Sequence, residues 1–113
     1  MARLRSDFWV SAYIRRCNLE NLPAVLRRRG SAEAGAIFIK VDRLDGTGDL
    51  YGPAPQAEIS IDYSDDRTFS KILKNESVIS IEERVNREVK FDSDLWLVEV
   101  DSSSGECFIF ISE

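Results

Sequence analysis

The chain has 113 residues, of which 43% are apolar and 31% are charged, and its net charge is −5. This composition excludes an intrinsically disordered chain and is typical of a single globular domain, which we expect over residues 1–113. No apolar run approaches the ~18 residues that cross a bilayer, so we expect no membrane partner. Because the basic N-terminus has no apolar h-region before Asp7, we also expect no signal peptide.

The charges are unevenly distributed along the sequence. Residues 1–43 carry nine basic and four acidic side chains, whereas residues 44–113 carry six and sixteen. Such a split fits a basic arm that binds nucleic acid, two halves that face each other within the fold, or contacts between two copies. The acidic total disfavours nucleic acid, because broad affinity for it depends on neutralising many phosphates.

The sequence contains no histidine, which removes the Ser-His-Asp and Cys-His arrangements and the usual general base. Its two cysteines, Cys17 and Cys107, are far apart and have apolar neighbours. We interpret them as buried free thiols in a reducing compartment, with a disulfide as the alternative. Without a Cys-x-x-Cys pair or a phosphate-binding loop, the sequence predicts no cofactor and no metal site.

Residues 6–18 have the periodicity of a helix that packs on one face. Ser6 is a suitable N-cap, and Asn21 and Pro23 mark the end. A strand over residues 8–14 is the alternative. The apolar stripe of the helix consists of Trp9, Val10, Tyr13, Ile14 and Cys17.

Two strands are predicted next, over residues 24–29 and 34–43, with a turn at Gly30. The second has apolar residues on both faces, which is typical of a strand in the interior of a sheet. Ile37, Ile39 and Val41 share one face, and Ala36, Phe38 and Lys40 share the other.

Residues 45–48 predict a turn, and a short return strand begins at Leu50. Residues 58–63 alternate between apolar and polar side chains, as a strand that is solvated on one face does. Residues 68–73 then pair back with that strand, or form a short helix instead.

A second helix is predicted over residues 77–89, with Glu82 and other charged residues facing solvent. Ser80 and Glu83 have the spacing of a capping box, and Ser77 is an earlier candidate for the cap. Two apolar strands follow over residues 95–100 and 107–111, and the polar turn between them predicts a hairpin. The fold class is therefore α+β: a twisted, mostly antiparallel sheet of about five to seven strands, with helices over about 6–18 and 77–89 packed on it.

Four segments, Phe8–Cys17, Ala34–Val41, Leu50–Pro55 and Phe91–Val100, resemble a family of short, uncharacterised alphaproteobacterial proteins that is classed only as a domain of unknown function. The chain departs from the pattern at Ser93, where the family would have proline. The resemblance implies a bacterial cytoplasmic protein and brings no activity with it.

Two groups of carboxylates are candidate sites. Asp92 and Asp94 can hold a divalent ion, but they more commonly accept backbone N–H groups in a loop. Glu99 and Asp101 share one strand face, and the predicted hairpin brings Glu106 near them. These three can raise one another's pKa for acid–base work, or form a solvated edge or pair with arginines.

The arginines of the N-terminal half are the main candidate for a surface that binds a partner or an anion, because guanidinium groups bind phosphates and carboxylates. Strand alternation would send Arg28 to one face and Arg27 and Arg29 to the other. Pairing with the acidic half of the chain is the structural explanation for the same residues. The candidate surface consists of Arg15, Arg16, Arg27, Arg28, Arg29 and Trp96.

These observations favour a non-enzymatic cytoplasmic protein-interaction or assembly module that acts through a sheet edge or the arginine surface. Its partner would be an unknown protein or a second copy in a homodimer. The alternative is a nucleic-acid or phosphate-ligand binder that uses the N-terminal arginine cluster. A small enzyme that uses Asp92, Asp94, Glu99 or Cys17 is a third class.

Overall fold

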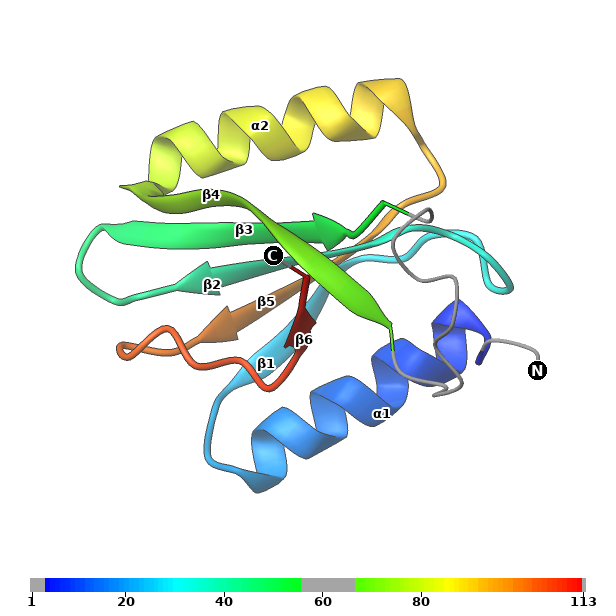
Figure 1. Ribbon diagram of the computed structural model, residues 1–113, viewed down its shortest axis with the longest axis horizontal. Helices are drawn as coiled ribbons and strands as arrows, with labels where there is room; N and C mark the ends of the chain where they lie inside the picture. The colour runs from blue at the N-terminus through cyan, green and yellow to red at the C-terminus, as the bar shows by residue number, and fades with distance from the viewer. Residues whose placement is uncertain (1–3, 56–66, 113) are drawn as a thin grey trace.

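The structure is a computed structural model that describes residues 4–55 and 67–112. Six strands form one open sheet in the order β1-β5-β2-β3-β4-β6, and the two helices lie on its opposite faces (Figure 1). The predicted α+β class, with two helices on a sheet, is confirmed. In chain order the elements are α1 (Ser6–Leu19), β1 (Ala24–Arg28), β2 (Ile37–Asp42), β3 (Thr47–Pro53), β4 (Thr68–Ser77), α2 (Val78–Phe91), β5 (Trp96–Asp101) and β6 (Phe110–Ile111).

The sheet is mixed, with antiparallel pairs in the majority. β1 and β5, β2 and β3, and β3 and β4 pair antiparallel, whereas β2 and β5, and β4 and β6, pair parallel. β2 and β5 are parallel because the chain crosses over through α2 before it enters β5 beside β2. Neither helix of the described residues is long and apolar enough to cross a bilayer.

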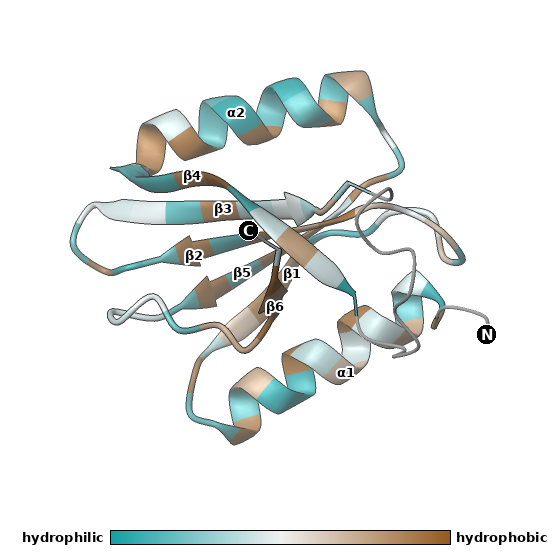
Figure 2. Cartoon of the chain, in the orientation of Figure 1, coloured by the Kyte–Doolittle hydropathy of each residue, from teal (hydrophilic) through white to brown (hydrophobic). Residues whose placement is uncertain are grey.

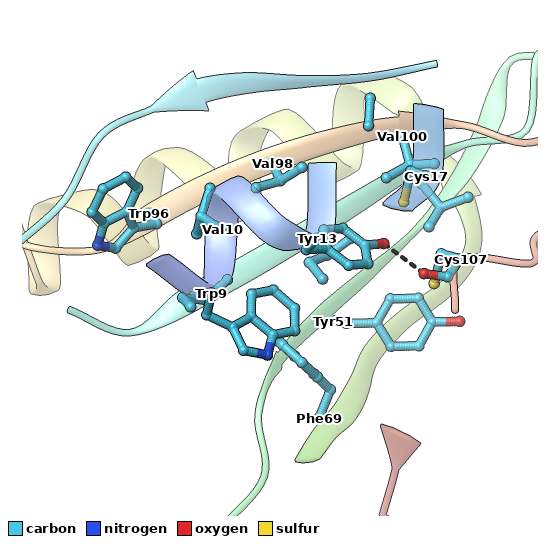
Figure 3. Packing of buried hydrophobic residues seen from close by; sticks show 14 residues of the cluster. Trp9, Val10, Tyr13, Cys17, Tyr51, Phe69, Trp96, Val98, Val100 and Cys107 are labelled. Atoms are coloured by element: carbon cyan, nitrogen blue, oxygen red, sulfur yellow. Dashed lines mark hydrogen bonds between the residues drawn. The ribbon is translucent and has the colours of Figure 1, made fainter. Parts of the chain in front are cut away.

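The apolar stripe of α1 packs on one face of the sheet. Trp9 stacks on Tyr13 at 4.9 Å between ring centroids, and the Tyr13 hydroxyl donates a hydrogen bond to the Cys107 carbonyl at 2.6 Å (Figure 3). Cys17 and Cys107 are both buried and free, and burial raises the pKa of the Cys107 thiol to about 12. The sheet contributes the predicted inward face of β2 to this cluster, namely Ile37, Ile39 and Val41.

The α2 side holds a second, smaller cluster. Ile81 and Val85 of α2 pack with Phe38 of β2, Leu50 of β3 and Leu97 of β5. The middle of α2 is otherwise largely hydrophilic, whereas hydrophobic and hydrophilic residues are interspersed along the strands (Figure 2). The two faces predicted for β2 therefore serve two separate layers of core, because alternate side chains of one strand point to opposite sides of the sheet.

The predicted C-terminal hairpin is wrong. β5 pairs with β1 and β2, and β6 lies beside β4, four positions away from β5 in the sheet order. Cys107 enters the α1-side cluster, and Phe108 and Ile109 pack against it. A hairpin partner could not pair with β5, because β1 and β2 already occupy both of its sides. The last segment instead buries its apolar side chains against the α1-side cluster, which removes apolar surface from water.

The alternative of a short helix over residues 68–73 is also wrong, because β4 is a continuous strand from Thr68 to Ser77 that pairs with β3. The predicted strand over residues 58–63 lies outside the described residues. At the start of α1, Arg5 occupies the N-cap position, and the hydroxyl of Ser6 donates instead to the Gly35 carbonyl at 2.7 Å.

Replacing Ser77 with alanine should lower the free energy of unfolding by about 1 kcal/mol. Ser77 is the N-cap of α2, and its hydroxyl accepts a hydrogen bond from the Ser80 amide at 3.1 Å. Ser80→Ala should cost less, because the Ser80 hydroxyl bonds only to that of Ser77 among the described residues. Urea denaturation measures both losses, and equal losses would contradict Ser77 as the cap.

Candidate functional site

The β1 edge of the sheet exposes apolar side chains. β1 is the first strand of the sheet order, and β5 is its only strand neighbour among the described residues. Val25 is 57% exposed and Leu26 is 38% exposed, whereas Ala24 is buried. Most proteins protect an edge strand with charges, proline or very short length. We define the β1 edge as Val25 and Leu26 together with the outward backbone groups of β1.

The hydrogen-bond pattern shows which backbone groups of β1 face outward. The Asp101 amide donates to the Pro23 carbonyl at 2.9 Å, so by alternation Val25 also bonds to β5. The N–H and C=O groups of Ala24 and Leu26 therefore point to the open side. The Ala24 amide already donates to Asn18 Oδ1 at 3.1 Å. Leu26 thus offers a free donor and acceptor to an added strand.

A β-bulge ends this edge and changes the direction of the arginines. The register of β1 against β5 shifts between Leu26 and Arg28, and such a bulge turns two successive side chains to nearly the same side. Arg27 bonds to Glu82 of α2, and Arg28 Nη2 donates to the Ser93 carbonyl just beyond α2 at 2.7 Å. The predicted alternation of Arg27 and Arg28 is therefore wrong.

Four charged side chains form a network beside the β1 edge, between the sheet and α2. We call Arg27, Lys40, Glu82 and Glu99 the charge network. Arg27 lies 2.9 Å from Glu82 and 2.6 Å from Glu99, and Lys40 lies 2.5 Å from Glu82 and 3.5 Å from Glu99. The Lys40 side chain is only 4% exposed, so it depends on these carboxylates for compensation of its charge.

The contacts within the charge network favour the charged forms of Glu82 and Arg27. The hydrogen bonds from Arg27, followed by those from Lys40, lower the pKa of Glu82 to about 2. The same contacts with Glu82 and Glu99 raise the pKa of Arg27. Glu82, which the sequence placed on the solvent side of the helix, instead reaches down to β2. The interpretation that arginines pair with the acidic half of the chain is confirmed for Arg27.

Three carboxylates cluster next to the charge network, and they are not the three that the sequence predicted. Oxygens of Asp42, Glu99 and Asp101 lie within 4.8 Å of one another. The parallel register aligns Asp42 with Asp101, whereas Glu106 lies on the segment that leaves β5 for the other edge. Burial, followed by the charges of Asp42 and Glu99, raises the pKa of Asp101. The observed group of carboxylates therefore contains Asp42 in place of the predicted Glu106.

The remaining predicted arginines do not join Arg27 and Arg28. Arg15 and Arg16 are exposed on α1, which covers the opposite face of the sheet, and Arg16 lies 5.0 Å from the centre of the Phe108 ring (Figure 1). Arg29 lies 5.2 Å from the centre of the Trp96 ring. The structure therefore does not assemble the predicted cluster on one surface.

Trp96 belongs to the core and not to a surface. It is 1% exposed, and its indole N–H donates to the Ser31 carbonyl at 2.7 Å. The Asp92 carboxylate accepts the Asp94 amide at 3.0 Å, which is the loop-ordering role considered for it. Cys17 is fully buried, and burial raises the pKa of its thiol, so it lacks the exposed thiolate that a nucleophile needs.

Sequence reasoning missed the partners of Lys40 and the exposure of Val25 and Leu26. One signal for Lys40 was present: a single lysine within the apolar run Ile37–Val41 requires a buried counter-charge. No comparable signal marks Val25 and Leu26, because an apolar pair in a short strand fits an interior position equally well.

Comparison with known proteins assigns the chain to a family. A family model described as "Protein of unknown function (DUF1491)" matches residues 4–110. The chain belongs to the DUF1491 family. A crystal structure of a DUF1491 protein from Caulobacter crescentus is 29% identical, with a TM-score of 0.80 over 99% of this chain and 100% of that chain.

Two solution studies give the same result. A protein from A. tumefaciens is 34% identical, with a TM-score of 0.80 over 99% of this chain and 98% of its own. An NMR structure of a C. crescentus DUF1491 protein is 28% identical, with a TM-score of 0.80 over the whole of both chains. A search of curated proteins finds no match. The resemblance to an alphaproteobacterial family without an assigned function is thus confirmed, and DUF1491 supplies no activity to transfer.

Proposed function

We propose that the protein is a non-enzymatic protein-interaction module that binds an extended segment of its partner along the β1 edge. The observation that carries this proposal is that Val25 and Leu26 stay 57% and 38% exposed on an edge strand, one on each face of the sheet. Adding a partner strand removes that apolar surface from water and pairs the outward groups of Leu26.

The surroundings of the β1 edge support a short, bounded contact. The bulge before Arg28 interrupts the strand, and Pro23 precedes it, so an added strand aligns with only a few residues. The charge network lies on the face of Val25, which is opposite Glu99, whereas Leu26 is opposite Val98 and points to the α1 face. An apolar centre with a charged border is the usual composition of a protein interface. The partner segment should therefore be apolar at its centre and extended in conformation.

The proposed location is the cytoplasm, in agreement with the two buried free thiols. Nucleic-acid binding remains the weaker hypothesis for this surface. Its five arginines would have to act together, but Arg15 and Arg16 lie on the opposite side of the sheet from Arg27. Affinity for a polyanion depends on the number of phosphates contacted at once, so divided arginines contribute little.

Val25→Lys and Leu26→Pro should both abolish partner binding. Lysine places a charge at the centre of the contact, and proline removes the outward N–H of Leu26 without removing a bond to β5. Affinity capture from an alphaproteobacterial extract, followed by mass spectrometry, identifies the bound protein. Light scattering after size-exclusion chromatography shows whether a second copy is the partner.

Ile79→Lys is the matched control, because Ile79 is 72% exposed on α2 and away from the β1 edge. A partner retained by the wild type and by Ile79→Lys, but lost by both edge variants, supports the proposal. Equal capture by all four proteins, or a monomer that captures nothing, rules it out.

A further inference from the structure

A cavity of about 360 Å³ opens on the other half of the sheet, on the side that α1 covers. It lies between β3 and β4 and the segment that leads to β6. Tyr51 and Lys71 line it as directly opposed residues of β3 and β4, and Arg43 and Glu106 complete its polar wall. In the sheet order β5 and β2 separate these strands from β1, so the cavity is independent of the β1 edge.

Tyr51 has a hydroxyl without a partner. The residue is 2% exposed, yet the hydroxyl makes no hydrogen bond to any residue of 4–55 or 67–112. Figure 3 shows the hydroxyl directed away from the rings of Trp9 and Phe69, and Tyr51 lines the cavity. The hydroxyl is open to the cavity and does not count among the described residues' buried polar atoms without a hydrogen-bond partner. A group that enters the cavity would supply one.

Two donor groups without an acceptor favour an anion in the cavity. Lys71 Nζ lies 5.3 Å from the centre of the Tyr51 ring and forms no ion pair with a described residue. Arg43 is held in place by the buried carboxylate of Asp49, which accepts bonds from Nε at 3.1 Å and Nη2 at 2.9 Å. Its Nη1 has no hydrogen bond within the described part of the chain.

Among the described residues of the cavity wall Glu106 is the one acidic residue, and its Oε2 accepts the Phe108 amide at 3.0 Å. With Asp49 behind Arg43 and Glu106 in the wall, the local charges sum to zero, and Lys71 and Arg43 Nη1 are the donors left without an acceptor among the described residues. Phe108 and Ile109 add an apolar side. The volume lies within the range of small-molecule sites, about 300–1,000 Å³.

We propose that this cavity binds a small molecule through an oxyanion, a carboxylate or a phosphate group. Lys71 and Arg43 neutralise its charge, and the Tyr51 hydroxyl donates a hydrogen bond to it. The apolar side next to Phe108 accommodates the remainder of the molecule.

The test is an NMR titration of ¹⁵N-labelled protein with sodium phosphate and, separately, with sodium acetate. The expected result is a saturable shift of amides near Tyr51, Lys71 and Gly105 with at least one of them, and the tighter of the two identifies the class of oxyanion. Sodium chloride at equal ionic strength should not reproduce it. Lys71→Gln should weaken the binding about tenfold and Tyr51→Phe about fivefold, as the loss of charged and neutral hydrogen bonds does.

Lys74→Gln is the matched control, because Lys74 is an exposed lysine of the same strand that does not line the cavity. Its affinity should equal that of the wild type. Three results would each overturn the proposal: shifts that stay linear with both anions, shifts located elsewhere, or equal weakening by Lys71→Gln and Lys74→Gln. The amide spectrum of each variant shows directly that it is folded.

Discussion

Replacing Asp49 with alanine should lower the free energy of unfolding by about 3 kcal/mol, the low end of the range for breaking a buried ion pair, because Arg43 keeps some access to water. Asp49 has no exposed surface, and its carboxylate accepts two hydrogen bonds from Arg43 and one from the Asn75 amide at 2.9 Å. Alanine leaves a partly buried guanidinium and a backbone N–H without these acceptors. It also releases Asn75, whose φ of 52° places it in the left-handed region.

Urea denaturation at neutral pH measures this loss. Asp45→Ala is the control, because Asp45 is an exposed turn residue whose carboxylate bonds only to Thr47 within the described residues. We expect Asp45→Ala to cost about 1 kcal/mol or less. If Asp49→Ala cost no more than the control, the Asp49 carboxylate would not be a buried anchor between β3 and β4.

Replacing Glu82 with alanine should lower the free energy of unfolding by about 2 kcal/mol at pH 7, as expected for hydrogen bonds to charged groups. The variant leaves buried Lys40 with Glu99 alone, at 3.5 Å. Lys40→Met should be nearly neutral or stabilising, because an apolar side chain replaces the buried charge and Arg27 still pairs with both carboxylates. Comparing the free energies of unfolding of the two variants therefore separates two effects. Glu82→Ala measures the cost of leaving the buried Lys40 charge without its nearer carboxylate, and Lys40→Met measures the net contribution of the lysine to stability.

The loss in Glu82→Ala should also depend on pH. The pKa of Glu82 falls from an ordinary value of 4.5 to about 2 in the folded protein, so its contribution is fully present above pH 4.5 and disappears as the pH falls to about 2. The difference in stability between wild type and variant should shrink over that interval. Urea titrations at pH 7, 4.5, 3 and 2 measure it, and a constant difference would mean that Glu82 is not paired in its charged form.

The structure changes which part of the N-terminal half carries functional interest. The arginines after Leu26 are the conspicuous feature of the sequence, but Arg27 and Arg28 are bonded within the fold. The apolar residues before them, Val25 and Leu26, are the ones left open. The arginine pairs thus keep the end of β1 in place beside α2, while the preceding residues form the edge that we propose as a binding surface.

Local pattern was sufficient for the two helices and for β2. The 3.6-residue spacing of apolar side chains predicted both helices to within two residues at each end, and alternation predicted both faces of β2. These features depend on neighbours within a few residues along the chain, so the sequence contains the whole cause. The resemblance in four segments likewise sufficed for the family.

The tertiary structure alone decided which strands are neighbours. No local signal places β5 between β1 and β2, yet that order aligns Asp42 with Asp101 and brings Lys40 beside Glu99. The bulge in β1 is equally invisible to an alternation rule, and it reverses the expected direction of Arg28. Strand order and register are set by which apolar faces bury best against α1 and α2, a property of the whole chain and not of any one segment.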